Sequence, residues 1–192
     1  MLAVTGVILA GGKAERMGGV DKGAVVYQGR PMVAQVAERF AALDEVLINL
    51  NHDVSPDYKA LGYPIIRDAE HPEIEAHAGP LLGILSGLEA AKSPWVLFSP
   101  CDTPKLPAQY VERMVAAVQD NMVMAAVAND GERVQPLHLL LNRRLHESLL
   151  IFLLSGQRKT FAWLNQIQPL EVDFSDVAEG FANINYREDV VD

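Results

Sequence analysis

The stretch TGVILAGGKAERMGGVDKG, residues 5–23, decides the fold. It opens with a continuous apolar run at 5–9, which indicates a strand buried on both faces of a sheet. Glycines follow, and they let the backbone approach a ligand and point successive N–H groups at an anion. Lys13, Arg16 and Lys22 add positive charge, and an arginine can hold a phosphate through two hydrogen bonds. The stretch therefore predicts a phosphate-binding loop at the end of a buried strand.

Two common phosphate-binding motifs are missing from this loop. It contains neither GxGxxG, which is typical of dinucleotide-binding proteins, nor GxxxxGK[ST], which is typical of P-loop proteins. An alternative interpretation is a surface loop whose glycines only form turns. The buried strand that precedes the loop favours the phosphate-binding interpretation.

Short apolar runs alternate with helical patterns along the rest of the chain. Strand candidates lie at 24–27, 45–49, 64–66, 95–98, 122–127, 137–141, 170–174 and 181–184. Helices are expected at 31–42, 80–91, 107–118 and 144–154, and another after Gly156. This alternation predicts an α/β fold: one domain, residues 1–192, with a mostly parallel sheet in a three-layer α/β/α, Rossmann-like arrangement. Ligands of such sheets bind beyond the carboxyl ends of the strands, so the loops after Leu9 and Phe98 are the segments of interest.

Charge and cysteine content narrow the function classes. The formal net charge is -9, which disfavours a general nucleic-acid binder. The single cysteine, Cys101, cannot form a disulfide within the chain. The first apolar run has no basic segment before it and is too short to span a bilayer, so we expect a cytoplasmic protein without a membrane segment. No heptads or large apolar stripe require assembly, and we expect a monomer.

The glycine-rich loop resembles that of small nucleotidyltransferases. Residues 9–22 follow the pattern LAGGxxxRMGxxxK, and this variant is very similar to that of the molybdenum cofactor guanylyltransferases. The similarity extends over nearly the whole chain, through Asp68, Gly79-Pro80-Leu81, Pro100-Cys101-Asp102-Thr103-Pro104, Asp130-Gly131-Glu132-Arg133, Asn183 and Asn185. The resemblance implies transfer of GMP from GTP to the phosphate of molybdenum-molybdopterin, with Mg²⁺ as cofactor. Pyrophosphate and molybdopterin guanine dinucleotide would be the products.

The resemblance also implies roles for individual residues. Arg16 and Lys22 would grip the triphosphate, and Asn49 would contact the guanine nucleoside, although Asn51 stands close enough to take that role. The backbone at the start of the loop would hold the nucleotide, through Leu9, Ala10, Gly11 and Gly12.

Two aspartates have roles that their chemistry supports. Asp68 would recognise guanine, because a carboxylate can accept hydrogen bonds from N1–H and N2–H₂ of that base; its structural alternative is a turn or cap residue. Asp102 would hold Mg²⁺ at the end of a central strand, while phosphate oxygens and waters complete the coordination shell. The alternative for Asp102 is a helix N-cap, because Pro104 and Pro107 follow it closely.

The residues that would bind the second substrate, the pterin, are less clear from the sequence. The resemblance places the pterin near Asn183 and Asn185, but the following residues are Tyr186-Arg187, where the family commonly has Thr-Pro. Residues 135–137 and 158–159 could also line the pterin site.

Cysteine and histidine chemistry is not expected to take part. Cys101 has no neighbouring histidine in the sequence and reads as a small buried residue. The histidines form no HxxxH pair and support no zinc site; they are His52, His71, His77, His138 and His146.

Two other functions remain open at this level. A related enzyme uses CTP with the same pterin, and its members usually read Leu-Ala-Ala-Gly where this chain has Leu9-Ala10-Gly11-Gly12; the double glycine favours the guanine enzyme. A regulatory module that binds a nucleotide without turnover is disfavoured because Arg16, Lys22 and Asp102 are all present. For the enzyme, we expect transient contacts with proteins that deliver the cofactor and proteins that mature molybdoenzymes.

Overall fold

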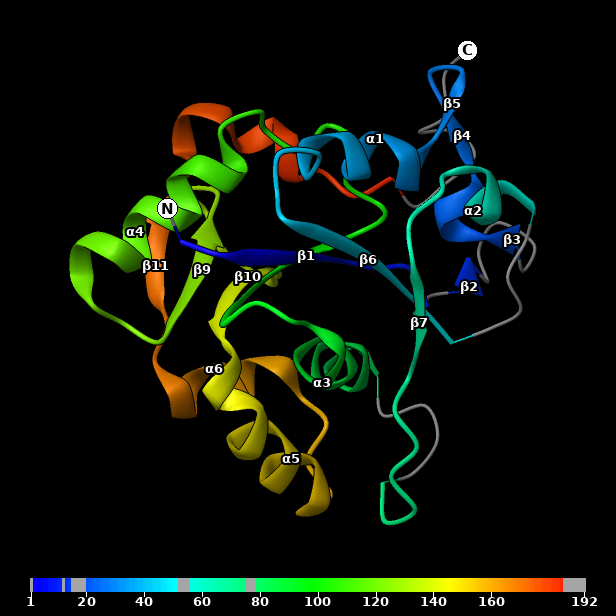
Figure 1. Cartoon of the computed structure of the whole chain (residues 1–192). Helices are drawn as coiled ribbons and strands as arrows, with labels where there is room; N and C mark the ends of the chain where they lie inside the picture. The colour runs from blue at the N-terminus through cyan, green and yellow to red at the C-terminus, as the bar shows by residue number, and fades with distance from the viewer. Residues whose placement is uncertain (1, 12, 15–19, 52–55, 75–78, 185–192) are drawn as a thin grey trace.

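The computed structural model describes residues 2–11, 13–14, 20–51, 56–74 and 79–184 of the chain. Gly12, Arg16 and Asn185, three of the predicted site residues, lie outside the described residues. A sheet of seven strands in the order β11-β9-β10-β8-β1-β6-β7 forms the centre of the molecule (Figure 1). Its strands are β1 Val4–Leu9, β6 Glu45–Leu50, β7 Ile65–Arg67, β8 Trp95–Pro100, β9 Ala125–Asn129, β10 Val134–Asn142 and β11 Leu170–Asp173.

The strands of this sheet are parallel with one exception. β1 pairs with β6 and β8 in parallel register, β6 pairs with β7, and β9 pairs with β11 in the same way. Only β10 runs antiparallel, between β8 and β9. The predicted mostly parallel sheet is confirmed, and the carboxyl ends of β1, β6 and β8 lie side by side at one edge.

Helices cover both faces of the sheet, so the predicted three layers are confirmed. α1 (Met32–Arg39) and α4 (Tyr110–Asn121) lie on one face, whereas α3 (Pro80–Ala90), α5 (His146–Leu154) and α6 (Thr160–Ile167) lie on the other (Figure 1). Each layer buries its own apolar cluster, because strands bury alternate side chains on opposite faces. Ile8 packs towards α1 and α4, and Val7 packs towards α3.

Short elements follow β1 and precede α1. β2 (Lys13–Ala14) pairs with β3 (Val20–Asp21), and the 3₁₀ helix η2 (Lys22–Ala24) begins directly after β3. β4 (Val26–Tyr27) and β5 (Arg30–Pro31) form a hairpin where residues 24–27 predicted a strand. The short helix α2 (Pro56–Ala60) has no counterpart among the predicted elements.

Several predicted elements differ from the structure. The strand expected at 122–127 begins only at Ala125, because α4 extends to Asn121 and Met122 follows it with a left-handed φ of 51°. The helix expected from Pro107 begins only at Tyr110, because Gln109 has φ -83° and ψ 2° and ends a turn in which the Tyr110 N–H donates to the Pro107 carbonyl at 3.0 Å. The strand expected at 181–184 is wrong. Phe181 ends the 3₁₀ helix η4 (Ser175–Phe181), and the Ile184 N–H donates to the Asp102 carbonyl instead of joining the sheet.

The apolar character of 181–184 reflects core packing. Phe181 and Ile184 are both buried, and neither belongs to a strand.

A third short 3₁₀ helix, η3 (Arg143–Leu145), precedes α5. Among the described residues, no helix is long and apolar enough to cross a membrane.

Candidate active site

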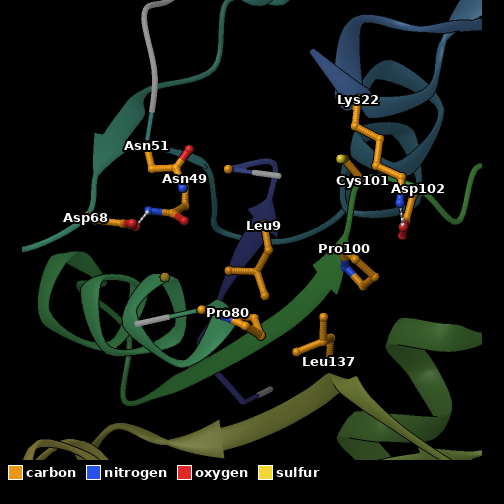
Figure 2. A pocket seen from close by; sticks show the side chains of 13 residues that line it. Leu9, Lys22, Asn49, Asn51, Asp68, Pro80, Pro100, Cys101, Asp102 and Leu137 are labelled. Carbon is orange, nitrogen blue, oxygen red and sulfur yellow. Dashed lines mark hydrogen bonds and ion pairs between the residues drawn. The ribbon is translucent and has the colours of Figure 1, made fainter. Parts of the chain in front are cut away.

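A cavity of about 360 Å³ opens at the edge of the sheet where β1, β6 and β8 end. Figure 2 shows it between two polar pairs, Lys22 with Asp102 and Asn49 with Asp68, with Leu9 between the pairs. The residues that line it are Leu9, Gly11, Lys22, Asn49, Asn51, Asp68, Gly79, Pro80, Gly83, Pro100, Cys101, Asp102 and Leu137. The cavity therefore occupies the position that a parallel sheet favours for a ligand.

Lys22 and Asp102 form an ion pair at one end of the cavity. The Lys22 Nζ donates to the Asp102 Oδ2 at 2.5 Å, and the two side chains are 19% and 12% exposed. Lys22 opens η2, whose preceding residue Asp21 accepts hydrogen bonds from the Gly23 N–H at 3.1 Å and the Tyr58 hydroxyl at 2.6 Å. These contacts hold the short helix so that Lys22 reaches across to the end of β8.

The backbone around Asp102 is attached to two other segments. The Cys101 N–H continues the β1–β8 pairing by donating to the Leu9 carbonyl at 3.1 Å, and the Ile184 N–H donates to the Asp102 carbonyl at 2.9 Å. No helix begins here, so the helix N-cap alternative for Asp102 is wrong. The Asp102 Oδ1 is buried and has no hydrogen-bond partner among the described residues. A buried carboxylate oxygen without a partner is costly unless a ligand or ion contacts it.

Asn49 and Asp68 form the other end of the cavity. The Asn49 Nδ2 donates to the Asp68 Oδ1 at 3.0 Å, and Asn49 is only 3% exposed. Asn51 lies beside the glycine-rich loop, where a side chain on Gly11 would come within 2.9 Å of the Asn51 carboxamide carbon. Carboxamide and carboxylate groups here present hydrogen-bonding atoms without a positive charge, which suits a nucleobase better than a phosphate.

The structure brings together most of the predicted site residues that it describes. The ones that line the cavity are Leu9, Gly11, Lys22, Asn49, Asp68 and Asp102. Ala10 is fully buried and does not line the cavity, and its N–H donates to the Asn49 carbonyl at 2.9 Å. Asn183 is exposed and does not line this cavity, although its neighbour Ile184 contacts the Asp102 backbone.

Sequence reasoning missed the contribution of Gly83 to the cavity wall. A side chain at Gly83 would come within 2.5 Å of the Asn49 Oδ1 and 3.1 Å of the Leu9 Cδ2. A glycine in the middle of an otherwise apolar helix is the signal that could have identified this close approach. Leu137, one of the residues weighed for the pterin, lines the cavity from β10.

Cys101 lines the cavity, but its thiol is not expected to react. Burial, together with the negative charge of Asp102, raises the pKa of the Cys101 thiol far above its usual range. A thiol that stays protonated is a poor nucleophile, which agrees with its interpretation as a small buried residue. Within the described ranges, no group of three His, Cys, Asp or Glu side chains is arranged to hold a metal ion.

The fold and the cavity define a nucleotide-binding α/β protein. The family model of the MobA-like NTP transferase domain matches residues 6–170 of this chain. A molybdenum cofactor guanylyltransferase from Shewanella sediminis is 39% identical over 188 residues, which cover 97% of this chain and 93% of that protein. A molybdenum cofactor guanylyltransferase from Histophilus somni is 38% identical over 188 residues, with 97% and 94% coverage.

Solved structures show the same fold at lower sequence identity. Molybdopterin-guanine dinucleotide biosynthesis protein A from Archaeoglobus fulgidus has a TM-score of 0.77 at 18% identity, covering 97% of this chain and 94% of that one. The 2-C-methyl-D-erythritol 4-phosphate cytidylyltransferase from Thermus thermophilus has a TM-score of 0.70 at 19% identity, covering 96% and 94%. The chain belongs to the MobA-like NTP transferase family, in the group whose members are molybdenum cofactor guanylyltransferases.

Proposed function

We propose that this protein transfers GMP from GTP to the terminal phosphate of molybdenum-molybdopterin, which releases pyrophosphate and forms molybdopterin guanine dinucleotide. One observation supports this most directly: a single cavity joins the Lys22–Asp102 pair to the Asn49–Asp68 pair. A bound nucleoside triphosphate needs a cationic group for its phosphates and hydrogen-bonding groups for its base. The cavity supplies both at opposite ends.

The base would bind at the Asn49–Asp68 end. Asp68 shares one carboxylate oxygen with Asn49, and its two oxygens together can accept from N1–H and N2–H₂ of guanine. Asn49 holds the carboxylate in place through this bond. The phosphates would then run past the backbone of Leu9 and Gly11 towards Lys22. Arg16 and Gly12, outside the described residues, belong to the same loop and are proposed as further triphosphate contacts.

Asp102 fits a magnesium ion. Its Oδ1 is buried and has no hydrogen-bond partner in the described part of the chain, and carboxylate oxygen is a preferred ligand of Mg²⁺. Mg²⁺ usually keeps several waters and takes one or two carboxylates plus substrate phosphates, so a lone aspartate is enough. When bound, the ion would neutralise phosphate charge.

The transfer is an in-line displacement at the α-phosphorus of GTP. An oxygen of the pterin phosphate forms the new P–O bond, and the bond from the α-phosphorus to its bridging oxygen breaks, so pyrophosphate leaves with the electron pair. The attacking phosphate is already anionic, so no general base is required. Lys22 and Arg16 would stabilise the negative charge that develops on the leaving pyrophosphate.

Asn183 and Asn185 are proposed to face the pterin. Asn183 is exposed next to Ile184, whose N–H contacts the Asp102 backbone, so this segment runs beside the reacting end of the cavity. We further propose that residues 1–192 act as one domain, as a monomer in the cytoplasm. Transient contacts with cofactor-delivering and molybdoenzyme-maturation proteins would bring the pterin and remove the product.

Calorimetry tests the nucleotide part of this proposal. GTP, CTP, ATP and UTP are titrated into the protein with Mg²⁺, and we expect a clear preference for GTP that Asp68→Ala removes. Incubation with GTP and molybdenum-molybdopterin should then release pyrophosphate. A preference for CTP would assign the chain to cytidylyl transfer, and binding of all four without pyrophosphate release would indicate a regulatory module.

A further inference from the structure

His138 is a buried histidine that the proposed reaction does not use. It lies in β10, is 2% exposed, and follows the cavity residue Leu137 directly. Burial lowers the pKa of its imidazole to about 3, so the ring is neutral at physiological pH. A neutral imidazole buried in the core is costly unless its nitrogens are hydrogen-bonded. A leucine would fill similar space without that cost, so the contacts of the ring need an explanation.

The imidazole contacts the residue next to Asp102. The His138 Nε2 lies 3.2 Å from the Thr103 Oγ1, and the same hydroxyl donates to the Pro100 carbonyl at 3.2 Å. Ser99 lies 3.4 Å from that hydroxyl. A threonine hydroxyl has one proton, so when it donates to the Pro100 carbonyl it accepts from the Nε2–H of His138. The imidazole therefore completes the hydrogen bonds of a turn that spans Asp102.

Aromatic side chains hold the imidazole in one orientation. Phe181 meets it edge-on with ring centroids 4.9 Å apart, and Tyr110 does so at 5.7 Å. Tyr110 is in turn fixed by its hydroxyl, which donates to the Phe98 carbonyl in β8 at 2.7 Å. Phe181 belongs to the segment that reaches Ile184, the donor to the Asp102 carbonyl. His138 thus contacts Thr103, which directly follows Asp102, and Phe181, which lies three residues before the donor to the Asp102 carbonyl.

We propose that His138 is a positioning residue for nucleotidyl transfer: through Thr103 it fixes the turn that aims the Asp102 carboxylate at Lys22 and at the magnesium-binding end of the cavity. This inference rests on the proposed function. The imidazole would touch neither the nucleotide nor the metal. Its effect passes through Thr103, so loss of either partner should have the same result.

A set of variants separates positioning from packing. His138→Leu and Thr103→Val each remove the contact, and the double variant tests whether the two residues act through that one contact. His138→Gln keeps a nitrogen donor of similar reach and tests rescue. Leu140→Ala is the packing control, because Leu140 is fully buried in β10 two residues along from His138. Mn²⁺, a paramagnetic substitute for Mg²⁺, is titrated into each protein with GTP and followed by electron paramagnetic resonance, alongside thermal unfolding, kcat and KM.

The expected pattern has four parts. His138→Leu and Thr103→Val each weaken Mn²⁺ binding to the GTP complex and lower kcat by about 10-fold to 100-fold, while KM for GTP stays within about twofold. The double variant is no worse than the worse single variant, because the two residues act through one contact. His138→Gln recovers most of the Mn²⁺ affinity. Leu140→Ala lowers the unfolding temperature and leaves Mn²⁺ affinity unchanged.

The opposite results would overturn the inference in distinct ways. A lower unfolding temperature in His138→Leu with unchanged Mn²⁺ affinity and kcat would make the imidazole a packing residue only. Additive losses of Mn²⁺ affinity and kcat in the double variant would show that His138 does not act through Thr103. A His138→Gln variant as impaired as His138→Leu would exclude a hydrogen-bonding role for the imidazole. A wild-type protein that binds neither GTP nor Mn²⁺ would overturn the proposed function itself, and the inference with it.

Discussion

Lys22 brings a positive charge to the lining of the cavity and contacts one oxygen of the Asp102 carboxylate, Oδ2. We expect Lys22→Ala to lower kcat/KM by about 100-fold to 1,000-fold, because a charge-assisted contact to the transition state is lost. Steady-state kinetics with GTP measures this. Lys92→Ala is the matched control, because Lys92 also forms an ion pair, with Glu45 at 3.0 Å, but is 86% exposed. Equal losses of kcat/KM in Lys22→Ala and Lys92→Ala would show that Lys22 acts only through the net charge of the protein.

Asp68 is expected to read the guanine amino group. Inosine triphosphate lacks that group, so wild type should bind GTP more tightly than inosine triphosphate. Asp68→Asn should weaken GTP binding by about 10-fold to 100-fold and remove most of the discrimination, because a hydrogen bond to a charged group contributes about 1.5–3 kcal/mol. Calorimetry with both nucleotides measures it. Asp176→Asn is the control, because Asp176 is 57% exposed and pairs with Arg113 at the surface; discrimination that survives in Asp68→Asn would place base recognition elsewhere.

At the scale of elements, α3 carries two glycines that meet different neighbours. An added Cβ at Gly83 would lie 2.5 Å from the Asn49 Oδ1, and one at Gly87 would lie 2.6 Å from the Phe98 ring. Gly83→Ala should weaken GTP binding by about 10-fold, since it displaces a carboxamide that faces the open cavity. Gly87→Ala should instead lower the free energy of unfolding by about 1–3 kcal/mol, because the Phe98 ring is enclosed. Calorimetry and urea unfolding on both variants separate the effects, and a stability loss without a binding loss in Gly83→Ala would contradict the first part.

The elements also show what the sequence could predict. The strands β1 and β8 were predictable because each is an apolar run buried on both faces, and their parallel pairing places the loop after Leu9 and Asp102 at one edge of the sheet. The direction of β10 could not be predicted, because an apolar run looks the same in parallel and antiparallel strands. The strand predicted at 181–184 was wrong for a related reason. Phe181 and Ile184 are apolar because they pack in the core, and the sequence does not distinguish such residues from those of a buried strand.

The site was partly predictable on the same terms. The resemblance to guanylyltransferases pointed to Asp68 and Asp102, and both line the cavity at the edge of the sheet where ligands are expected. The contacts that orient these carboxylates join segments far apart in the chain, such as His138 with Thr103 and Gly83 with Asn49. Nothing local in the sequence encodes such contacts, so they become visible only once the chain has folded.

At the scale of the whole molecule, His138 makes stability depend on pH. Its pKa is about 3 in the folded protein and about 6.5 in the unfolded chain. Above about pH 6.5 the imidazole is neutral in both states and contributes no pH dependence. As pH falls from 6.5 towards 3, the unfolded chain binds a proton that the folded protein does not, so stability falls with falling pH; below about 3 both states are protonated and the loss stops growing.

The contribution of His138 to the pH dependence of stability is best measured between about pH 6.5 and pH 5, above the usual pKa values of carboxylates. In the described part of the chain, five carboxylates also have pKa values lowered by hydrogen bonds in the fold, but their usual values of 3.8 and 4.5 place most of their effect below pH 5; they are Glu38, Glu45, Asp130, Asp173 and Asp176. Between about pH 6.5 and pH 5, His138 should cost about 2 kcal/mol of unfolding free energy, at about 1.4 kcal/mol per pH unit. Urea unfolding of wild type and His138→Gln across this window measures the difference, which cancels groups common to both proteins. Parallel curves would mean that the imidazole is protonated inside the folded protein, and its packing between Tyr110 and Phe181 would then have to admit a charge.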